Sequence, residues 1–209
     1  MFGFNFVELV AGLPGLIIAL ALHEYAHARM AVAMGDFTPK LMGRLTLNPL
    51  AHIDPIGFLV LLVARFGWAK PVVINPNNFR DRKKGEILVA FAGPAMNFLL
   101  AFLGLGVIFF LRGKMHMEMS HGLRTVLWLI VVYNINFGVF NLIPLPPLDG
   151  SRILAALLPY EMQYRYMAIE RYSMIIFIIF IATPILGYIL VPVAQFLLGL
   201  FSSVWLLFL

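Results

Sequence analysis

The chain has 209 residues, of which 62% are hydrophobic and only 12% are charged, and its formal net charge is +5. A soluble domain is usually about half apolar and about a quarter charged, so this composition predicts an integral membrane protein and excludes an ordinary soluble fold. A basic excess in a membrane protein is typical of cytoplasmic loops, and we expect no nucleic-acid partner. Cysteine is absent, which excludes disulfides and thiolate metal ligands.

The first long apolar segment covers residues 6–34 and is long enough for a tilted transmembrane helix. It contains the sequence HEYAH at residues 23–27. On a helix, this HExxH spacing places two imidazoles on one face, where both can bind one Zn²⁺. The glutamate between them is then available as a general base. Because ionisable side chains are costly inside a bilayer, the segment predicts a hydrolytic zinc site.

The stretch that follows is expected to stay on one side of the membrane. Residues 37–52 contain prolines and a glycine, which favours short strands or a β-hairpin. Ile53 to Phe66 is apolar but only about 14 residues long, a length that fits a re-entrant segment better than a span. Residues 68–85 are polar and basic, with a cluster formed by Arg80, Arg82, Lys83 and Lys84.

The second half of the chain is again mostly apolar. A short polar hairpin at 112–122 joins two predicted spans, and an amphipathic segment at 151–171 precedes a last stretch that is long enough for two short spans with a break near Pro184 to Pro192. The apolar stretches are residues 87–111, 123–148 and 172–209. The sequence therefore predicts an all-α polytopic membrane protein with a small β-hairpin or re-entrant segment after the first span. We expect one membrane-embedded domain over residues 1–209, with a core at about 6–158 and C-terminal apolar helices at about 172–209.

Charge predicts the orientation. No basic residue precedes the first span, whereas residues 35–85 are rich in lysine and arginine. The positive-inside rule then places the N-terminus outside and residues 35–85 in the cytoplasm.

A catalytic zinc needs a third protein ligand, and several residues are candidates. Asp149 is favoured because it is a lone carboxylate in a proline-broken apolar stretch, where irregular backbone is tolerated only if it lines a cavity or is buried. The alternative is that Asp149 caps a helix that begins near Ser151. The other candidates are Asp36, Asp54, Glu86, Glu161 and His52.

Chain direction tests this choice. HExxH lies toward the C-terminal end of the first span, and Asp149 lies at the C-terminal end of the third. The two can meet only if both spans run in the same direction, which requires an odd number of crossings between them. Residues 87–111 supply that crossing, provided that residues 53–66 do not cross. The site is then expected nearer the cytoplasmic face.

Three motifs together resemble the site-2 protease family of intramembrane zinc metalloproteases. They are HEYAH, the sequence AGPAMN at residues 92–97, and NLIPLPPLDG at residues 141–150, and the resemblance covers about residues 10–160. The run GRLTLNPLAHIDP at residues 43–55 is similar to the short bacterial and archaeal members. Some larger members carry PDZ or CBS domains, and we expect neither here, because the hairpin at 112–122 is too short for a PDZ domain and the C-terminal stretch is apolar.

The resemblance implies roles for individual residues. His23, His27 and Asp149 are expected to hold one Zn²⁺ per chain, with Glu24 as the general base. Asn141 matches an asparagine thought to hold substrate or the developing oxyanion. The implied substrate is a transmembrane protein or peptide in the lipid bilayer of a bacterial or archaeal cell membrane.

Some interpretations stay open at this point. Asn141 is also suited to an ordinary inter-helix hydrogen bond, and Asn97 is more suited to a structural role than a catalytic one. His52 and Asp54 fit either a place beside the ligands or substrate, or a turn around Asp54-Pro55. A divalent-metal transporter or metal-binding membrane protein is the alternative function, because histidine and aspartate in spans also suit ion pathways. The oligomeric state is not predicted.

Overall fold

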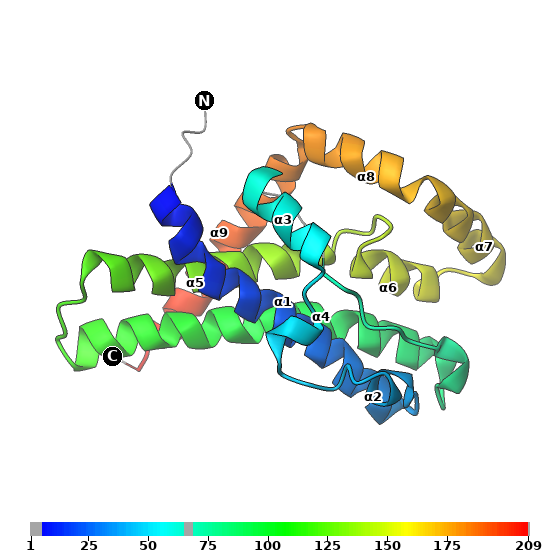
Figure 1. The fold of residues 1–209 in the computed structure, drawn as a ribbon, viewed down its shortest axis with the longest axis horizontal. Coiled ribbons are helices and arrows are strands. Elements are labelled where there is room, and N and C mark those ends of the chain that lie inside the picture. The colour runs from blue at the N-terminus through cyan, green and yellow to red at the C-terminus, as the bar shows by residue number, and fades with distance from the viewer. Residues whose placement is uncertain (1–5, 65–68, 209) are drawn as a thin grey trace.

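The computed structural model describes residues 6–64 and 69–208, and these are mostly helical (Figure 1). The centre consists of three mutually packed long helices, α1 (Phe6–Met34), α4 (Arg82–Phe109) and α5 (His121–Asn141). In Figure 1, α4 and α5 form an antiparallel hairpin and α1 lies across it. A fourth long helix, α9 (Ile185–Leu206), packs against α5 and α4.

Shorter elements connect and flank these helices. Between α1 and α4 lie α2 (Thr38–Leu41), η1 (Pro49–Ala51), α3 (Pro55–Ala64) and η2 (Pro76–Asn78), and a π-helical turn, η3 (Phe110–Lys114), extends α4. After α5 come α6 (Asp149–Leu157), α7 (Tyr160–Ala168), η4 (Ile169–Tyr172) and α8 (Ser173–Ala182).

The helical membrane class predicted from composition is confirmed. Within the described ranges, four helices have the length and apolar composition needed to cross a bilayer, namely Leu9–Met34, Arg82–Lys114, His121–Asn141 and Ile185–Leu206. The predicted break in the C-terminal stretch occurs at Thr183-Pro184, but Pro192 lies inside α9. A proline removes one backbone hydrogen bond, and membrane helices tolerate that loss, so the break falls at the Pro184 end of the predicted range and α9 continues through Pro192.

The predicted β-hairpin is wrong for the part of the chain that the structure describes. Residues 37–52 form α2 and η1, and strand-like pairing is limited to one antiparallel bridge between Ile53 and Ala69. Both short helices have a proline in their first turn, where its fixed φ favours helix over strand. The 10-residue α3 is too short for a span, and residues 65 and 66 of the predicted re-entrant segment lie outside the described residues.

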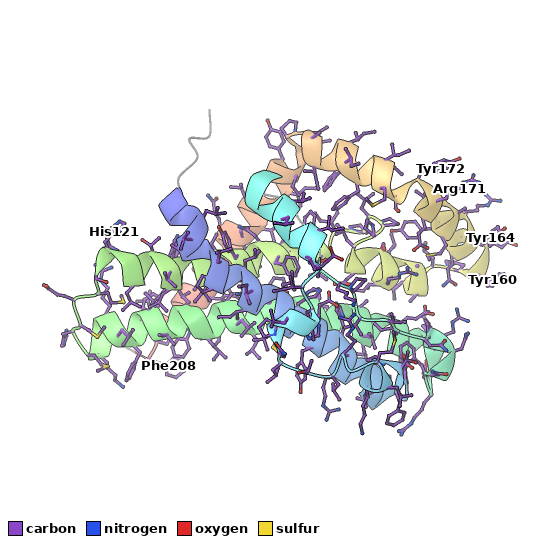
Figure 2. All side chains as sticks on the ribbon, viewed as in Figure 1. His121, Tyr160, Tyr164, Arg171, Tyr172 and Phe208 are labelled. Atoms are coloured by element: carbon purple, nitrogen blue, oxygen red, sulfur yellow. The ribbon has the colours of Figure 1, made fainter. Side chains whose placement is uncertain are left out.

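The predicted amphipathic segment forms α6, α7 and η4. Helix α6 packs on α4 and on α7. Figure 2 shows Tyr160, Tyr164, Arg171 and Tyr172 pointing outward from α7 and η4. Arg152 on α6 pairs with Glu170 on η4 at 2.7 Å, which links the two ends of this segment.

Close helix packing depends on small residues. A Cβ atom on Gly15 of α1 would lie 2.9 Å from the Ile130 Cα atom of α5, so only glycine permits this approach. Near the C-terminal end of α4, the Trp205 ring covers Gly106, and the indole N–H donates to the Phe102 carbonyl oxygen at 2.9 Å. Membrane helices associate mainly through such packing, since lipid is as apolar as the helices themselves.

Asp36 holds the segment before α4 against the end of α1. Its buried carboxylate accepts hydrogen bonds from the Asn75 N–H at 2.7 Å, from the Asn78 amide at 2.8 Å, and from the Thr38 hydroxyl at 2.6 Å and N–H at 3.1 Å. Burial disfavours the charged carboxylate, but these hydrogen bonds outweigh burial and hold the pKa of Asp36 below its usual value.

We predict that Asp36→Ala lowers the free energy of unfolding by about 1–3 kcal/mol, because it leaves buried N–H groups without an acceptor. Since the folded pKa is lowered, the ionised carboxylate stabilises the fold above about pH 4, and this contribution disappears as the pH falls through the folded pKa. Thermal unfolding in detergent measures both effects. The matched control is Glu118→Ala in the exposed loop before α5. Equal melting temperatures for Asp36→Ala and wild type at neutral pH would contradict this prediction.

Candidate metal centre

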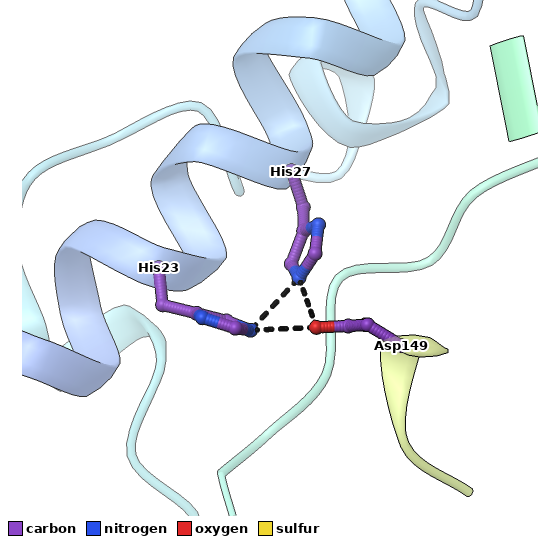
Figure 3. A group of neighbouring side chains, drawn as sticks. All are labelled: His23, His27 and Asp149. Atoms are coloured by element: carbon purple, nitrogen blue, oxygen red, sulfur yellow. Dashed lines mark hydrogen bonds and ion pairs between the residues drawn. The ribbon is translucent and has the colours of Figure 1, made fainter. Parts of the chain in front are cut away.

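Two histidines and one aspartate converge at the middle of the molecule. His23 and His27 lie one turn apart on α1 and are buried, and their Nε2 atoms are 2.9 Å apart. The Oδ2 atom of Asp149 lies 3.1 Å from His23 Nε2 and 3.2 Å from His27 Nε2 (Figure 3). The three atoms therefore form a nearly equilateral triangle. No other group of three potential metal-binding side chains occurs among residues 6–64 and 69–208.

The turn after α5 positions Asp149. Helix α5 ends at Asn141, and Asp149 is the first residue of α6. A Cβ atom on Gly150 would collide with the Leu142 carbonyl, so the glycine lets α6 begin directly against the turn. The N-cap of α6 is Leu148, with no side-chain cap hydrogen bond. Asp149 is therefore not a capping residue, and the alternative interpretation of this carboxylate is wrong.

The helix directions agree with the crossing argument. Figure 1 shows α1 and α5 running toward the same end of the molecule. Helix α4, which lies between them in the sequence, runs in the opposite direction. The His27 Nδ1 atom lies 2.7 Å from the Val89 carbonyl oxygen in the first half of α4. One intervening long helix thus brings HExxH and Asp149 to the same level.

Hydrogen bonding fixes which nitrogen of each histidine carries the proton. The partner of His27 Nδ1 is a carbonyl oxygen, and the partner of His23 Nδ1 is Asn97 Oδ1, at 2.7 Å. The Asn97 amide group donates to the Ala19 carbonyl at 2.9 Å, which identifies the other end of the carboxamide as oxygen. Both Nδ1 atoms must therefore donate, and in the neutral imidazoles both Nε2 atoms present lone pairs.

These lone pairs meet a third acceptor. Asp149 Oδ2 is buried and accepts no hydrogen bond, although both histidine nitrogens are within about 3.2 Å. Three lone pairs this close repel one another unless a positive charge relieves the repulsion, either a second proton on an imidazole or a metal ion between the three atoms. A tetrahedral zinc with bonds of about 2.0–2.1 Å holds its ligand atoms about 3.3 Å apart, close to the observed spacing. Imidazole nitrogens whose second ring N–H is hydrogen-bonded are typical zinc ligands, so the residues fit the metal.

Gly93 on α4 provides room for this cluster. A Cβ atom at this position would lie 2.5 Å from both His27 Nε2 and His23 Cε1. The backbone of α4 therefore forms one wall of the centre. Phe137 of α5 forms another wall, with its ring centroid 4.9 Å from that of His23.

Glu24 lies beside the cluster rather than in it. Its half-buried carboxylate accepts a hydrogen bond from the Val72 N–H at 2.9 Å. Val72 belongs to the extended segment that Asp36 holds at Asn75. The glutamate is thus held by backbone of the segment between α3 and α4.

The structure does not bring the other predicted residues into the cluster. The Asn141 amide donates to the Phe137 carbonyl of its own helix at 2.9 Å. Asp54 caps α3 by accepting from the Gly57 N–H at 2.8 Å. The ring of His52 is buried and lies 2.9 Å from the Thr46 carbonyl oxygen.

The remaining acidic candidates have other partners or positions. Asp36 holds the segment before α4, Glu86 pairs with Arg82 at 2.9 Å, and Glu161 is exposed on α7. The contacts that sequence reasoning missed are mainly with backbone groups, the carbonyls of Val89 and Ala19 and the N–H of Val72. Backbone groups leave no signal in a sequence.

The helical fold and the buried cluster of two histidines and a carboxylate are typical of membrane metalloproteins. Comparison with known proteins agrees. The sequence model of peptidase family M50 matches residues 113–186. YwhC of Bacillus subtilis, named a candidate zinc metalloprotease, is 41% identical over 201 residues, which are 91% of this chain and 90% of the relative.

Rip2 of Mycolicibacterium smegmatis, also named a candidate zinc metalloprotease, is 32% identical over 181 residues, or 84% of this chain and 68% of the relative. The zinc metalloprotease MJ0392 of Methanocaldococcus jannaschii is 26% identical over 149 residues, or 71% of this chain and 34% of the relative. No solved structure matches the chain at a comparable level of significance. The chain therefore belongs to the site-2 protease family, peptidase family M50, as a multi-pass membrane metalloprotease whose cofactor is zinc.

We predict that Gly93→Ala lowers the zinc affinity at least about tenfold, since the added methyl group displaces both imidazoles from their common point. Competition with a chromophoric chelator on detergent-purified protein measures this affinity. Gly187→Ala is the matched control, because a Cβ atom at Gly187 of α9 meets nothing within 4 Å. An unchanged affinity in Gly93→Ala would show that the histidines do not bind the metal at this point.

Proposed function

We propose that this protein is an intramembrane zinc endopeptidase that cleaves transmembrane segments of membrane protein substrates. One observation carries the proposal. Three side-chain lone pairs converge at a buried point, and a carboxylate lies next to it on the same helix. This combination suits metal-assisted hydrolysis more than ion transport, for which a pathway with further intramembrane acids is expected.

His23, His27 and Asp149 are the ligands in this proposal. A zinc ion bound there supplies Lewis acidity, which polarises a peptide carbonyl and makes water more acidic. Glu24 takes the proton of the attacking water and later delivers it to the leaving amine. The hydrogen bond from the Val72 N–H holds one oxygen of Glu24, and we assign proton transfer to the other.

Asn141 is the proposed donor toward the developing negative charge. Its amide donates to the Phe137 carbonyl, so it must turn away from its own helix to reach a substrate. The position supports the assignment, because Asn141 is the last residue of α5, where the turn to Asp149 begins. We assign no catalytic role to His52 or Asp54.

The substrate must unwind before cleavage, since helical carbonyls are already hydrogen-bonded within the helix.

We propose residues 6–158 as the peptidase core, within a single domain that includes the C-terminal helices. We also propose that the site lies nearer the cytoplasmic side. The exposed basic residues of segment 80–84 support this orientation, because they lie at the end of α4 that is closer to His27.

We predict about one zinc per chain in wild-type protein purified in detergent, and a sharp loss of zinc in both His23→Ala and Asp149→Ala, because three ligands are needed for tight binding. Elemental analysis of the purified proteins measures the metal content. If Asp149→Ala retained the zinc that His23→Ala lost, another residue would supply the third ligand.

We predict that Glu24→Gln retains zinc but lowers the rate of cleavage about 10²–10⁴-fold, because the amide cannot accept the proton. The assay follows cleavage of a reporter transmembrane peptide in proteoliposomes beside metal analysis of the same preparation. Full cleavage activity in Glu24→Gln would refute the role of the base. Zinc flux into the proteoliposomes that survives this substitution would favour the transporter alternative.

A further inference from the structure

A second buried asparagine continues the hydrogen-bond chain behind His23. Asn97 on α4 and Asn134 on α5 are both completely buried. The Asn97 amide donates to Asn134 Oδ1 at 3.1 Å as well as to the Ala19 carbonyl. The Asn134 amide donates in turn to the Ile130 carbonyl at 2.8 Å. The chain therefore joins α1, α4 and α5 at the level of His23.

Each link in this chain has a defined direction. The carbonyl of Ile130 is an acceptor only, so the NH₂ group of Asn134 must face it and the oxygen must face Asn97. This places the NH₂ group of Asn97 between two acceptors and turns its oxygen toward His23 Nδ1. A reversed amide at either position would bring two donors or two acceptors together.

We propose that Asn134 is a positioning residue for the zinc ligand His23 and acts on it through Asn97. By holding the Asn97 oxygen toward Nδ1, it keeps the proton on Nδ1 and the lone pair of Nε2 toward the metal. The inference rests on the proposed ligand role of His23. The equivalent partner of His27 is the Val89 carbonyl, a backbone group that substitution cannot remove.

The position of Asn134 explains why a side chain is needed there. The buried NH₂ group of Asn97 has two N–H donors and needs two acceptors to hold its orientation. The Ala19 carbonyl supplies only one of them. Asn134 supplies the second from α5, the helix that leads to Asp149. The same residue thus links the helix with two ligands to the helix that precedes the third.

The test measures zinc affinity by chelator competition on full-length protein in detergent. Asn97→Leu removes the direct partner of His23, and such losses typically weaken zinc binding about 10–100-fold. Asn134→Leu acts one bond further away, and we expect about a threefold to tenfold loss. In its protonated form, Asn134→Asp keeps an oxygen toward Asn97 and a hydroxyl that can donate to the Ile130 carbonyl, so it is expected to bind zinc more tightly than Asn134→Leu. The matched control is Asn136→Leu, a half-buried asparagine on the same helix.

A double-mutant cycle separates positioning from general packing. If Asn134 acts through Asn97, Asn134→Leu has no further effect on zinc affinity in the Asn97→Leu background. The visible spectrum of the Co²⁺-loaded protein gives a second readout, since a turned imidazole changes the ligand field. We expect the same shift in Asn97→Leu and Asn134→Leu, and none in the control.

Three results would overturn the proposal. The first is an Asn134→Leu protein with wild-type zinc affinity and an unchanged Co²⁺ spectrum. The second is an additive loss in the double variant, and the third is a loss in the Asn136→Leu control equal to that in Asn134→Leu. Either of these last two would indicate a packing effect. If wild type bound no zinc, or His23→Ala kept it, the proposed function itself would fail, so the two failures are distinguishable.

Discussion

The repulsion among three buried lone pairs is the constraint on which the centre of this protein depends. Two imidazole Nε2 atoms and a carboxylate oxygen lie 2.9–3.2 Å apart, and in the neutral imidazoles the ring protons are held on the far side of each ring, so that a further proton or a metal ion is needed to relieve the repulsion. A buried polar group without a partner costs about 1–3 kcal/mol. Structural zinc sites contribute about 10–16 kcal/mol at neutral pH, so a bound cation offsets the cost several times over. Metal binding and packing of α1, α4 and α6 are therefore coupled.

Glycines at two backbone positions allow this convergence. Gly93 lets α4 pass within contact of both imidazoles, and Gly150 lets α6 begin against the Leu142 carbonyl. Farther along α4, the same kind of approach at Gly106 is filled by an aromatic ring rather than by polar atoms. The difference is chemical rather than geometric. Close approach of apolar helices gives stability anywhere in a bilayer, but it gives a site only where polar side chains face the gap.

The sequence predicted the first helix, the crossing pattern and the three converging residues, because each depends on a strong local signal. A span is recognised by length and hydropathy, HExxH by helical spacing, and Asp149 by the rarity of a carboxylate among prolines. The segment between α1 and α4 was predicted less well. Its fold depends on Asp36 and on backbone contacts between residues far apart in the chain, for which periodicity offers no signal. The two prolines that suggested a hairpin instead begin short helices.

That segment also lies against the metal centre on the side of Glu24. Glu24 lies on α1 and Asp36 lies just after its end. Glu24 accepts a hydrogen bond from the Val72 N–H, and Asp36 accepts one from the Asn75 N–H. His23 and His27 are buried, Glu24 is half-buried, and Val73, the residue after Val72, is 48% exposed. Exposure thus increases from the histidines to Glu24, whereas Val72, which donates to Glu24, is itself buried. In the proposed mechanism water has to reach Glu24 but not the far side of the histidines, and the greater exposure of Glu24 supports the role proposed for it.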